Sequence, residues 1–303
     1  MLHSLTRTFD YLTKKISGVV GITINNTSID LIKIKGAGKS ARITIANRFE
    51  LANSIFTDKE YHEESIDAFN QIGNLIGSSF SPIQIALPDP LFSIRQFPLE
   101  NLPGSKKPQI AYVQWNFSKI LNNENISCDS HVINSSSPCL LGIAVENLWI
   151  SQLLDILKKS NIHPTVINPS SLYLLEGNLD INLRKHNKAI IVMNDGYWTL
   201  IITDANNNIV YFNPQWSSDI ATADIVLSCT NQIKSLTIEN QSILPQEILV
   251  IDSKSADQAY ALEIQQAIDE DVSIISLPES FKRTTCTQPF KLTLANLGPG
   301  ILQ

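Results

Sequence analysis

The segment VVGITINNTSIDLIKIK, residues 19–35, decides the expected fold of this chain. Its two halves are rich in β-branched and aliphatic residues, which favour strands, and the pair Asn25 and Asn26 separates them. Asparagine tolerates left-handed backbone angles and is frequent in tight turns, so the segment predicts two antiparallel strands joined at this pair. Residues 41–51, after the glycine-containing turn 36–38, predict a third strand of the same sheet.

A second segment repeats this pattern in the other half of the chain. Residues 189–212 read AIIVMNDGYWTLIITDANNNIVYF and predict three strands, with a turn at 194–196 and an asparagine-rich turn at 206–208. Each meander leads into helical patterns, at 64–77 in the first half and 217–235 in the second. The repeat is too long for a solenoid and predicts a duplicated α/β domain. The alternative is two unrelated α/β lobes.

The stretch between the two meanders has a different pattern. It predicts two strands, a helix, two strands and a second helix, in the order 83–88, 91–99, 108–121, 131–134, 139–145 and 147–160. Such a stretch is long enough to form a small α+β subdomain. Residues 165–168 predict a short strand that leads back toward the second meander.

Composition excludes two classes of protein. Of the 303 residues 43% are hydrophobic, which is enough for a packed core and argues against gross disorder. The chain has 23 basic and 29 acidic residues, a net charge of -6. Binding of nucleic acid without sequence preference needs a basic surface, which the chain as a whole lacks. We therefore expect a folded protein with no nucleic-acid partner.

The cysteines and the start of the chain bear on its compartment. Cys128, Cys139, Cys229 and Cys286 form no C-x-x-C pair, so neither a zinc site nor a disulfide framework is indicated. No run approaches the ~18–20 apolar residues of a membrane-spanning helix. Residues 1–17 lack the apolar block of a signal peptide. We expect a cytoplasmic chain.

Residues 1–17 predict an amphipathic helix. Arg7, Lys14 and Lys15 outnumber Asp10. One interpretation packs the helix on its own domain, and the other lays it on the anionic inner leaflet as a peripheral membrane contact. The apolar stripe on which both depend consists of Leu2, Leu5, Phe9, Leu12 and Ile16.

Three stretches carry a resemblance to a known family. Residues 21–27, GITINNT, look like a first phosphate loop, and residues 83–99, IQIALPDPLFSIRQFPL, look like the entry to an inserted subdomain. Residues 153–171, LLDILKKSNIHPTVINPSS, look like a crossover back to the first lobe, and Gln114-Trp115-Asn116 stands where the family has a Trp-Glu pair. In this order the stretches resemble the PilM-type proteins of type IV pilus assembly, with their MSHA-pilus and type II secretion counterparts.

The resemblance implies an α/β, actin-like (ASKHA, ribonuclease H-like) fold of two lobes with an inserted small α+β subdomain. The implied units are an N-terminal helix, a first lobe, the inserted subdomain, a return to the first lobe, a second lobe and a C-terminal segment that packs back on the first lobe. Their bounds are 1–17, 18–81, 82–163, 164–187, 188–288 and 289–303.

The nucleotide loops that the resemblance implies depart from the family pattern. Where the family has a carboxylate for magnesium and water, this chain has Thr23 in the first loop and Asn194 in the second. Hydrolysis of ATP needs such a carboxylate, and glycine lets the backbone approach phosphate. Asp195 lies one residue off and is expected to face the other way. The loop positions are Thr23, Asn25, Asn26, Thr27, Asn194, Gly196, Thr199, Asp252 and Ser253.

We therefore expect a pseudo-ATPase with no catalytic residue, no metal site and no nucleotide cofactor. Two alternatives are an active ATPase or kinase of the same fold, for which ATP and Mg²⁺ would be required, and an α/β enzyme of another fold. One ring of Tyr197-Trp198 is expected in the cleft between the lobes, because neighbouring strand residues face opposite sides. The remaining conspicuous carboxylates are expected to be solvated charges; they are Asp89, Glu100, Glu146 and Asp155.

The resemblance also implies a partner. It is the cytoplasmic tail of a single-span inner-membrane protein of the pilus or secretion machine, bound in a groove between the first lobe and the inserted subdomain. The chain would then be a cytoplasmic scaffold peripheral to the inner membrane, with its oligomeric state left open. The residues expected to line the groove are Leu91, Phe92, Ile94 and Trp115.

Overall fold

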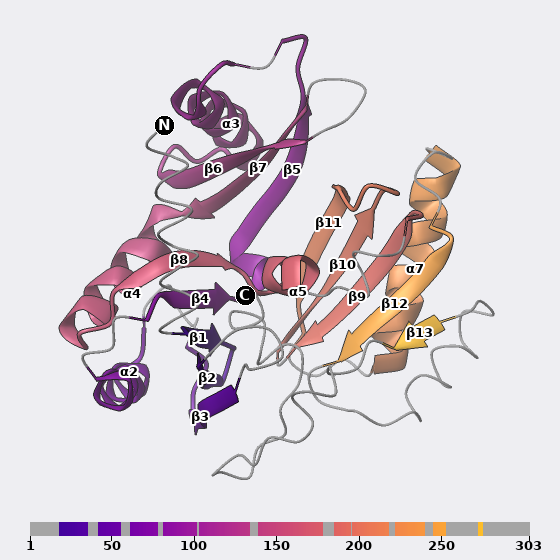
Figure 1. Cartoon of the computed structure of the whole chain (residues 1–303). Coiled ribbons are helices and arrows are strands. Elements are labelled where there is room, and N and C mark those ends of the chain that lie inside the picture. The colour runs from indigo at the N-terminus through magenta and orange to yellow at the C-terminus, as the bar shows by residue number, and fades with distance from the viewer. Residues whose placement is uncertain are drawn as a thin grey trace.

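Two five-stranded sheets of the same topology form the body of the molecule, and a third, three-stranded sheet stands beside them in the computed structural model (Figure 1). The strand orders are β3-β2-β1-β4-β8, β11-β10-β9-β12-β13 and β5-β7-β6. The structure describes residues 18–35, 42–55, 61–77, 81–101, 103–133, 139–177, 185–194, 196–217, 222–239, 245–252 and 272–274.

The first lobe is built on the predicted meander. Strands β1 and β2 pair antiparallel on either side of the Asn25–Thr27 turn, which confirms the hairpin, and β4 and β8 extend the sheet in parallel. Helices α2 and α4 cover one face and share its apolar core. The elements are β1 (Val19–Ile24), β2 (Ser28–Lys35), β3 (Arg42–Glu50), α2 (Glu63–Ile76), β4 (Ile83–Leu87), α4 (Asn147–Lys159) and β8 (Pro164–Pro169).

The second lobe repeats this sheet strand for strand, which confirms the predicted duplication. Helix α7 packs on one face, over Trp198 and Leu200, and α5 packs on the other, over Ile190 and Val192. The elements are α5 (Ser170–Gly177), β9 (Lys188–Asn194), β10 (Tyr197–Thr203), β11 (Ile209–Trp216), α7 (Thr222–Glu239), β12 (Glu247–Asp252) and β13 (Val272–Ile274). Helix α5, which the sequence patterns did not predict, thus fills the space between the lobes.

The inserted subdomain is a three-stranded antiparallel sheet with one helix on its outer face. Phe97, Val113 and Phe117 form the centre of its small core, and Gly142 lies directly beneath them. The elements are β5 (Phe92–Pro98), α3 (Lys106–Leu121), β6 (Ile126–Ile133) and β7 (Cys139–Glu146).

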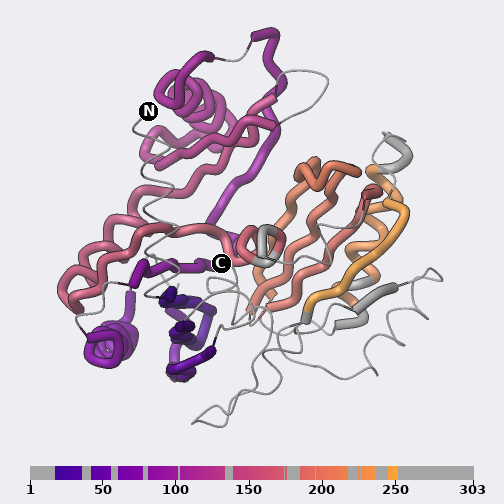
Figure 2. Tube along the Cα trace, in the orientation of Figure 1, coloured from indigo at the N-terminus to yellow at the C-terminus, as the bar shows by residue number. Residues whose placement is uncertain are grey.

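The predicted bounds of this subdomain, 82–163, are too wide at both ends. Strand β4 hydrogen-bonds to β1 and belongs to the first sheet. Helix α4 packs through Leu153 and Leu157 into the core of the first lobe. Figure 2 shows the chain leaving the first lobe after β4, tracing the subdomain, and returning through α4 and β8. The predicted helix at 1–17 and the segment 289–303 lie outside the described residues.

Helices α2 and α4 approach closely at one glycine. A Cβ atom added to Gly73 would lie 2.0 Å from the carbonyl oxygen of Ser160, at the end of α4. Because that neighbour is backbone, it cannot turn aside as a flexible side chain would. Glycine at this position therefore sets the distance between the two helices.

We expect Gly73→Ala to lower the free energy of unfolding by about 1–3 kcal/mol, since the added methyl group must push the helices apart. The sign of this change in unfolding free energy is informative, because glycine to alanine inside an unobstructed helix stabilises a protein by about 0.5–1 kcal/mol. Urea denaturation measures the effect, and Asn74→Ala, at an exposed position of the same helix, is the control. A Gly73→Ala variant as stable as the wild type would contradict the close contact.

Candidate functional site

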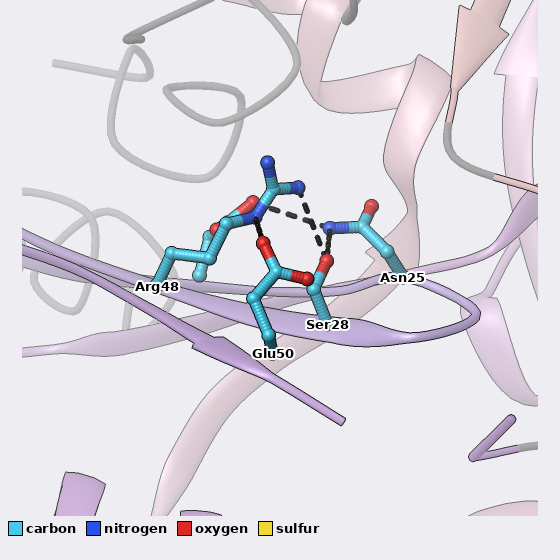
Figure 3. A network of polar contacts seen from close by, with 5 residues as sticks. Asn25, Ser28, Arg48 and Glu50 are labelled. Carbon is cyan, nitrogen blue, oxygen red and sulfur yellow. Dashed lines mark hydrogen bonds and ion pairs between the residues drawn. The ribbon is translucent and has the colours of Figure 1, made fainter. Parts of the chain in front are cut away.

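The turn between β1 and β2 is closed by hydrogen bonds among its own side chains. The Asn25 side-chain amide donates to Ser28 Oγ and to Asp30 Oδ2, both at 3.1 Å (Figure 3). Asp30 is fully buried and pairs with Arg48, whose Nε lies 3.0 Å from Oδ1. Arg48 also lies 3.3 Å from the Glu50 carboxylate. The side-chain amide of Asn25 and the guanidinium of Arg48 therefore fill the space beside the first loop.

The first loop also touches the second loop, across the boundary between the lobes. Gly196 has a φ of +85°, and a Cβ atom there would lie 2.7 Å from the Cβ of Asn26. The Asn26 side chain accepts a hydrogen bond from the Ser54 hydroxyl, and the Leu51 N–H donates to the Thr27 carbonyl at 2.8 Å. The side chain of Asn26 thus occupies the space between the two loops.

A buried carboxylate joins the lobes next to this contact. Asp89 lies in the short 3-10 helix η2 (Asp89–Leu91) directly after β4, and it is 0% exposed. Its Oδ2 accepts from the Thr199 hydroxyl of β10 at 2.7 Å, and its Oδ1 accepts from the Ser171 N–H of α5 at 3.0 Å. One carboxylate therefore links the first sheet, α5 and the second sheet.

Two more polar groups complete this buried cluster. The Asn194 side-chain amide donates to the Tyr197 hydroxyl at 2.5 Å and lies 3.4 Å from the Ser170 hydroxyl. Tyr197 is buried on the face of the sheet that carries Thr199, whereas Trp198 lies in the core beneath α7. The expectation that one of the two rings lies between the lobes is confirmed, and the ring is that of Tyr197.

Burial governs the electrostatics of the cluster. Removal from water raises the pKa of Asp89 to about 6, although hydrogen bonds from Ser171 and Thr199 oppose the shift. Burial, with a smaller effect of the Asp89 charge, raises the pKa of Tyr197 well above its ordinary value. The expectation that Asp89 is a solvated charge is wrong, because the second lobe covers it. Glu100 and Asp155 are exposed as expected.

The positions predicted to replace catalytic carboxylates are buried. Thr23 is 1% exposed and pairs with Asp30 in the sheet register, and Asn194 is 7% exposed at the end of β9. Within the described part of the chain, Thr23 Oγ1 and Asn194 Oδ1 have no hydrogen-bond partner. Asp252 ends β12, and Ser253 lies outside the described residues.

These residues fit a magnesium–nucleotide complex poorly. Mg²⁺ prefers carboxylate oxygens with room for several waters. The two buried carboxylates of this region, Asp30 and Asp89, are both engaged by protein donors. Among the described residues no group of three or more His, Cys, Asp or Glu side chains is placed to hold a metal ion.

The four predicted residues do not come together in one partner groove, although Ile94 lines a groove described below. Phe92 is 6% exposed in the core of the first lobe, and Ile94 is 5% exposed in the core beneath α5. Leu91 packs at the edge of the first of these cores. Trp115 is 55% exposed on α3, away from the other three. Phe92 and Ile94 lie two residues apart on β5 and therefore share a strand face, but that face is covered.

A different groove separates the inserted subdomain from α5 and the second lobe. It consists of two pockets of about 330 Å³ each, which share Leu141 of β7 and Ile209 of β11. The Gln96 side-chain amide crosses it and donates to the Ile209 carbonyl at 2.5 Å. Leu172 of α5 lines its floor and Arg95 of β5 lines one end. We name it the junction groove.

Apart from Ile94, the residues that line the junction groove were not predicted from the sequence. Its walls come from β5–β7, from α5 and from the β10–β11 hairpin, which are far apart in the chain. Strands β5 and β11 lie next to each other as the edges of two different sheets. Such a juxtaposition follows from how the lobes pack and not from any local pattern.

Comparison with known structures identifies the fold. A chain of the PilM–PilN type IV pilus biogenesis complex matches with a TM-score of 0.70 at 11% identity, over 95% of this chain and 96% of that one. The cytoplasmic domain of EpsL, an inner-membrane component of the type II secretion system of Vibrio cholerae, matches with a TM-score of 0.53 at 10% identity, over 94% of both chains. The ethanolamine utilization protein EutJ from Carboxydothermus hydrogenoformans matches with a TM-score of 0.53 at 10% identity, over 99% of both chains.

These likenesses confirm the predicted actin-like, two-lobed fold. The chain shares the architecture of the PilM and EpsL structures, as the resemblance in its sequence implied. Neither a protein-family model nor a curated protein sequence matches the chain. None of the described helices is long and apolar enough to cross a bilayer.

The pH dependence of the stability of an Asp89→Asn variant tests whether the pKa of the buried carboxylate is raised. The folded pKa, about 6, is higher than the ordinary 3.8, so the folded state binds this proton more tightly than the unfolded state does. The stabilisation is complete below about pH 4 and is lost as the pH rises through 6. We expect the stability of Asp89→Asn relative to the wild type to rise by up to about 3 kcal/mol between pH 4 and pH 7.

Denaturant titrations at a series of pH values measure this difference. Asp155→Asn, which removes an exposed carboxylate from α4, is the matched control and should show no comparable trend. A difference between Asp89→Asn and the wild type that stays constant with pH would contradict the assignment.

Proposed function

We propose that this chain is a cytoplasmic, actin-like scaffold of a type IV pilus or related secretion apparatus, peripheral to the inner membrane, which binds the cytoplasmic tail of an inner-membrane assembly protein and does not hydrolyse ATP. The observation that carries the proposal is the likeness to a chain of the PilM–PilN complex across 95% of this chain. That complex joins two proteins of pilus biogenesis. EpsL, which shares the fold, is an inner-membrane component of a type II secretion system.

The junction groove is the surface that best suits an extended peptide tail. Its floor is aliphatic, with Leu141, Leu172 and Ile209, and its rim is polar. On the rim the Lys106 ammonium lies 2.6 Å from the Asp129 carboxylate. An apolar floor with a few polar groups at the edge is typical of sites that bind peptide side chains.

The interlobe contacts support the absence of hydrolysis. The Asn26 side chain stands against Gly196 where phosphate would lie, and Thr23 and Asn194 are neutral. Opening the site would separate Asn26 from Gly196 and break the Asp89–Thr199 hydrogen bond. A nucleotide would have to replace these contacts before it gained any binding energy.

One observation favours the alternative of an active ATPase or kinase. Asp89 is a buried carboxylate with its pKa raised to about 6, as is typical of a general base. Both of its oxygens, however, accept hydrogen bonds within the protein. These hydrogen bonds account for the burial of Asp89 as a link between the lobes, so no catalytic role is needed to explain it.

Isothermal titration with Mg-ATP distinguishes the two functions. We expect no saturable heat and no phosphate release above background from the purified full chain. We also expect Thr23→Ala to leave pilus or secretion activity in cells unchanged, because Thr23 Oγ1 has no hydrogen-bond partner among the described residues. Micromolar affinity for Mg-ATP, with phosphate release abolished by Asp89→Asn, would establish the enzyme instead.

The groove is tested by Leu141→Asn, which keeps the branched shape and the number of heavy atoms of the side chain and removes its apolar character. Burial of one leucine is worth about 1.5–3 kcal/mol, so we expect the affinity for the partner tail to fall about 10- to 100-fold. The measurement is a pull-down with the cytoplasmic tails of single-span membrane proteins encoded beside this chain. Leu227→Asn, at an exposed leucine of α7, is the control. Unchanged recovery with Leu141→Asn, in a variant that melts like the wild type, would exclude this groove.

A further inference from the structure

Helix α3 presents a tryptophan directly to solvent. Val113 and Phe117 are its buried residues, and Trp115 lies between them in sequence, 55% exposed. At 100° per residue, Trp115 points about 160° away from each of the two, so the indole faces straight out from the subdomain core. Trp115 is therefore not part of the core of this subdomain.

Three lysines lie on the same helix as this indole, and the helix has no acidic residue. The Lys119 ammonium stacks on the Trp115 ring, 3.5 Å from its centroid, and Lys107 is exposed on the first turn. Within the described part of the chain neither lysine pairs with an acidic side chain. Residues 106–121 contain three lysines and no Asp or Glu, although the whole chain has a net charge of -6. Lys106, the third lysine, is neutralised by Asp129.

The position of α3 favours a flat, extended partner. The helix lies on the outer side of the three-stranded sheet, at the end of the subdomain that projects from both lobes (Figure 1). A bilayer is planar on this scale and can meet only such a projecting face. Tryptophan is enriched at membrane–water interfaces, and lysine beside it reaches anionic headgroups.

We propose that the outer face of α3, defined by Lys107, Ala111, Trp115 and Lys119, docks on an anionic lipid surface. The indole enters the headgroup region while the two ammonium groups lie against phosphates. This contact is separate from the partner groove and from residues 1–17. It would hold the scaffold at the membrane from which the tail of a single-span protein emerges.

Co-sedimentation of the full chain with phosphatidylcholine vesicles, with and without phosphatidylglycerol, tests the proposal. The wild type should bind only the anionic vesicles and should be released by high salt. Each lysine contributes about fivefold near such a surface, so Lys107→Gln with Lys119→Gln should weaken binding about 25-fold. Trp115→Ala should weaken it about tenfold or more. All these side chains are exposed, so thermal melts should match the wild type.

Matched controls occupy other exposed faces. Trp216→Ala removes an exposed tryptophan from β11, and Lys158→Gln with Lys159→Gln removes two exposed lysines from α4. Both should bind anionic vesicles like the wild type. The proposal is overturned if the wild type does not bind, or if the α3 variants bind as well as these controls do. It is also overturned if Trp115→Ala loses the partner tail but keeps vesicle binding, which would make this face a protein interface.

Discussion

The two lobes of this molecule are held together by the buried carboxylate of Asp89, which accepts hydrogen bonds across the boundary between them. The carboxylate accepts one hydrogen bond from the second sheet, through Thr199, and one from α5, through the Ser171 N–H. A buried charge is costly unless donors surround it, and leaving such donors unpaired is costly too. Separation of the lobes would incur both costs. The hydrogen bonds of Asp89 therefore resist separation of the two lobes.

The space between the two loops is filled because the first loop has asparagine side chains, whereas the family that the sequence resembles has glycine. Asn25 and Asn26 occupy the turn where a phosphate loop keeps the backbone bare, and each uses its side chain within the protein. Gly196 keeps the left-handed backbone of the second turn but faces Asn26. Amide side chains thus occupy the volume between the two loops.

The sequence predicted the features that local patterns determine. Asn25 and Asn26 marked the first hairpin, and the repeat of that pattern at 189–212 gave the duplicated sheet. The environment of Asp89 was beyond reach, because its partner Thr199 lies 110 residues away. The same reason applies to Phe92: alternation showed that it shares a strand face with Ile94, but not that two different cores cover that face. The junction groove was missed because its walls meet only after the lobes have packed.

The link between the lobes at Asp89 and the junction groove are connected by a single short segment. Asp89 begins η2, which packs against β10 and β11, and β5 starts at the next residue after η2. Ile94 and Gln96 of β5 then line the groove opposite β11. The hydrogen bonds of Asp89 thus fix where β5 leaves the first lobe, and through it the width of the groove. Because this connection is rigid, it keeps the groove preformed, and a peptide that bound there would be spared the cost of ordering its own site.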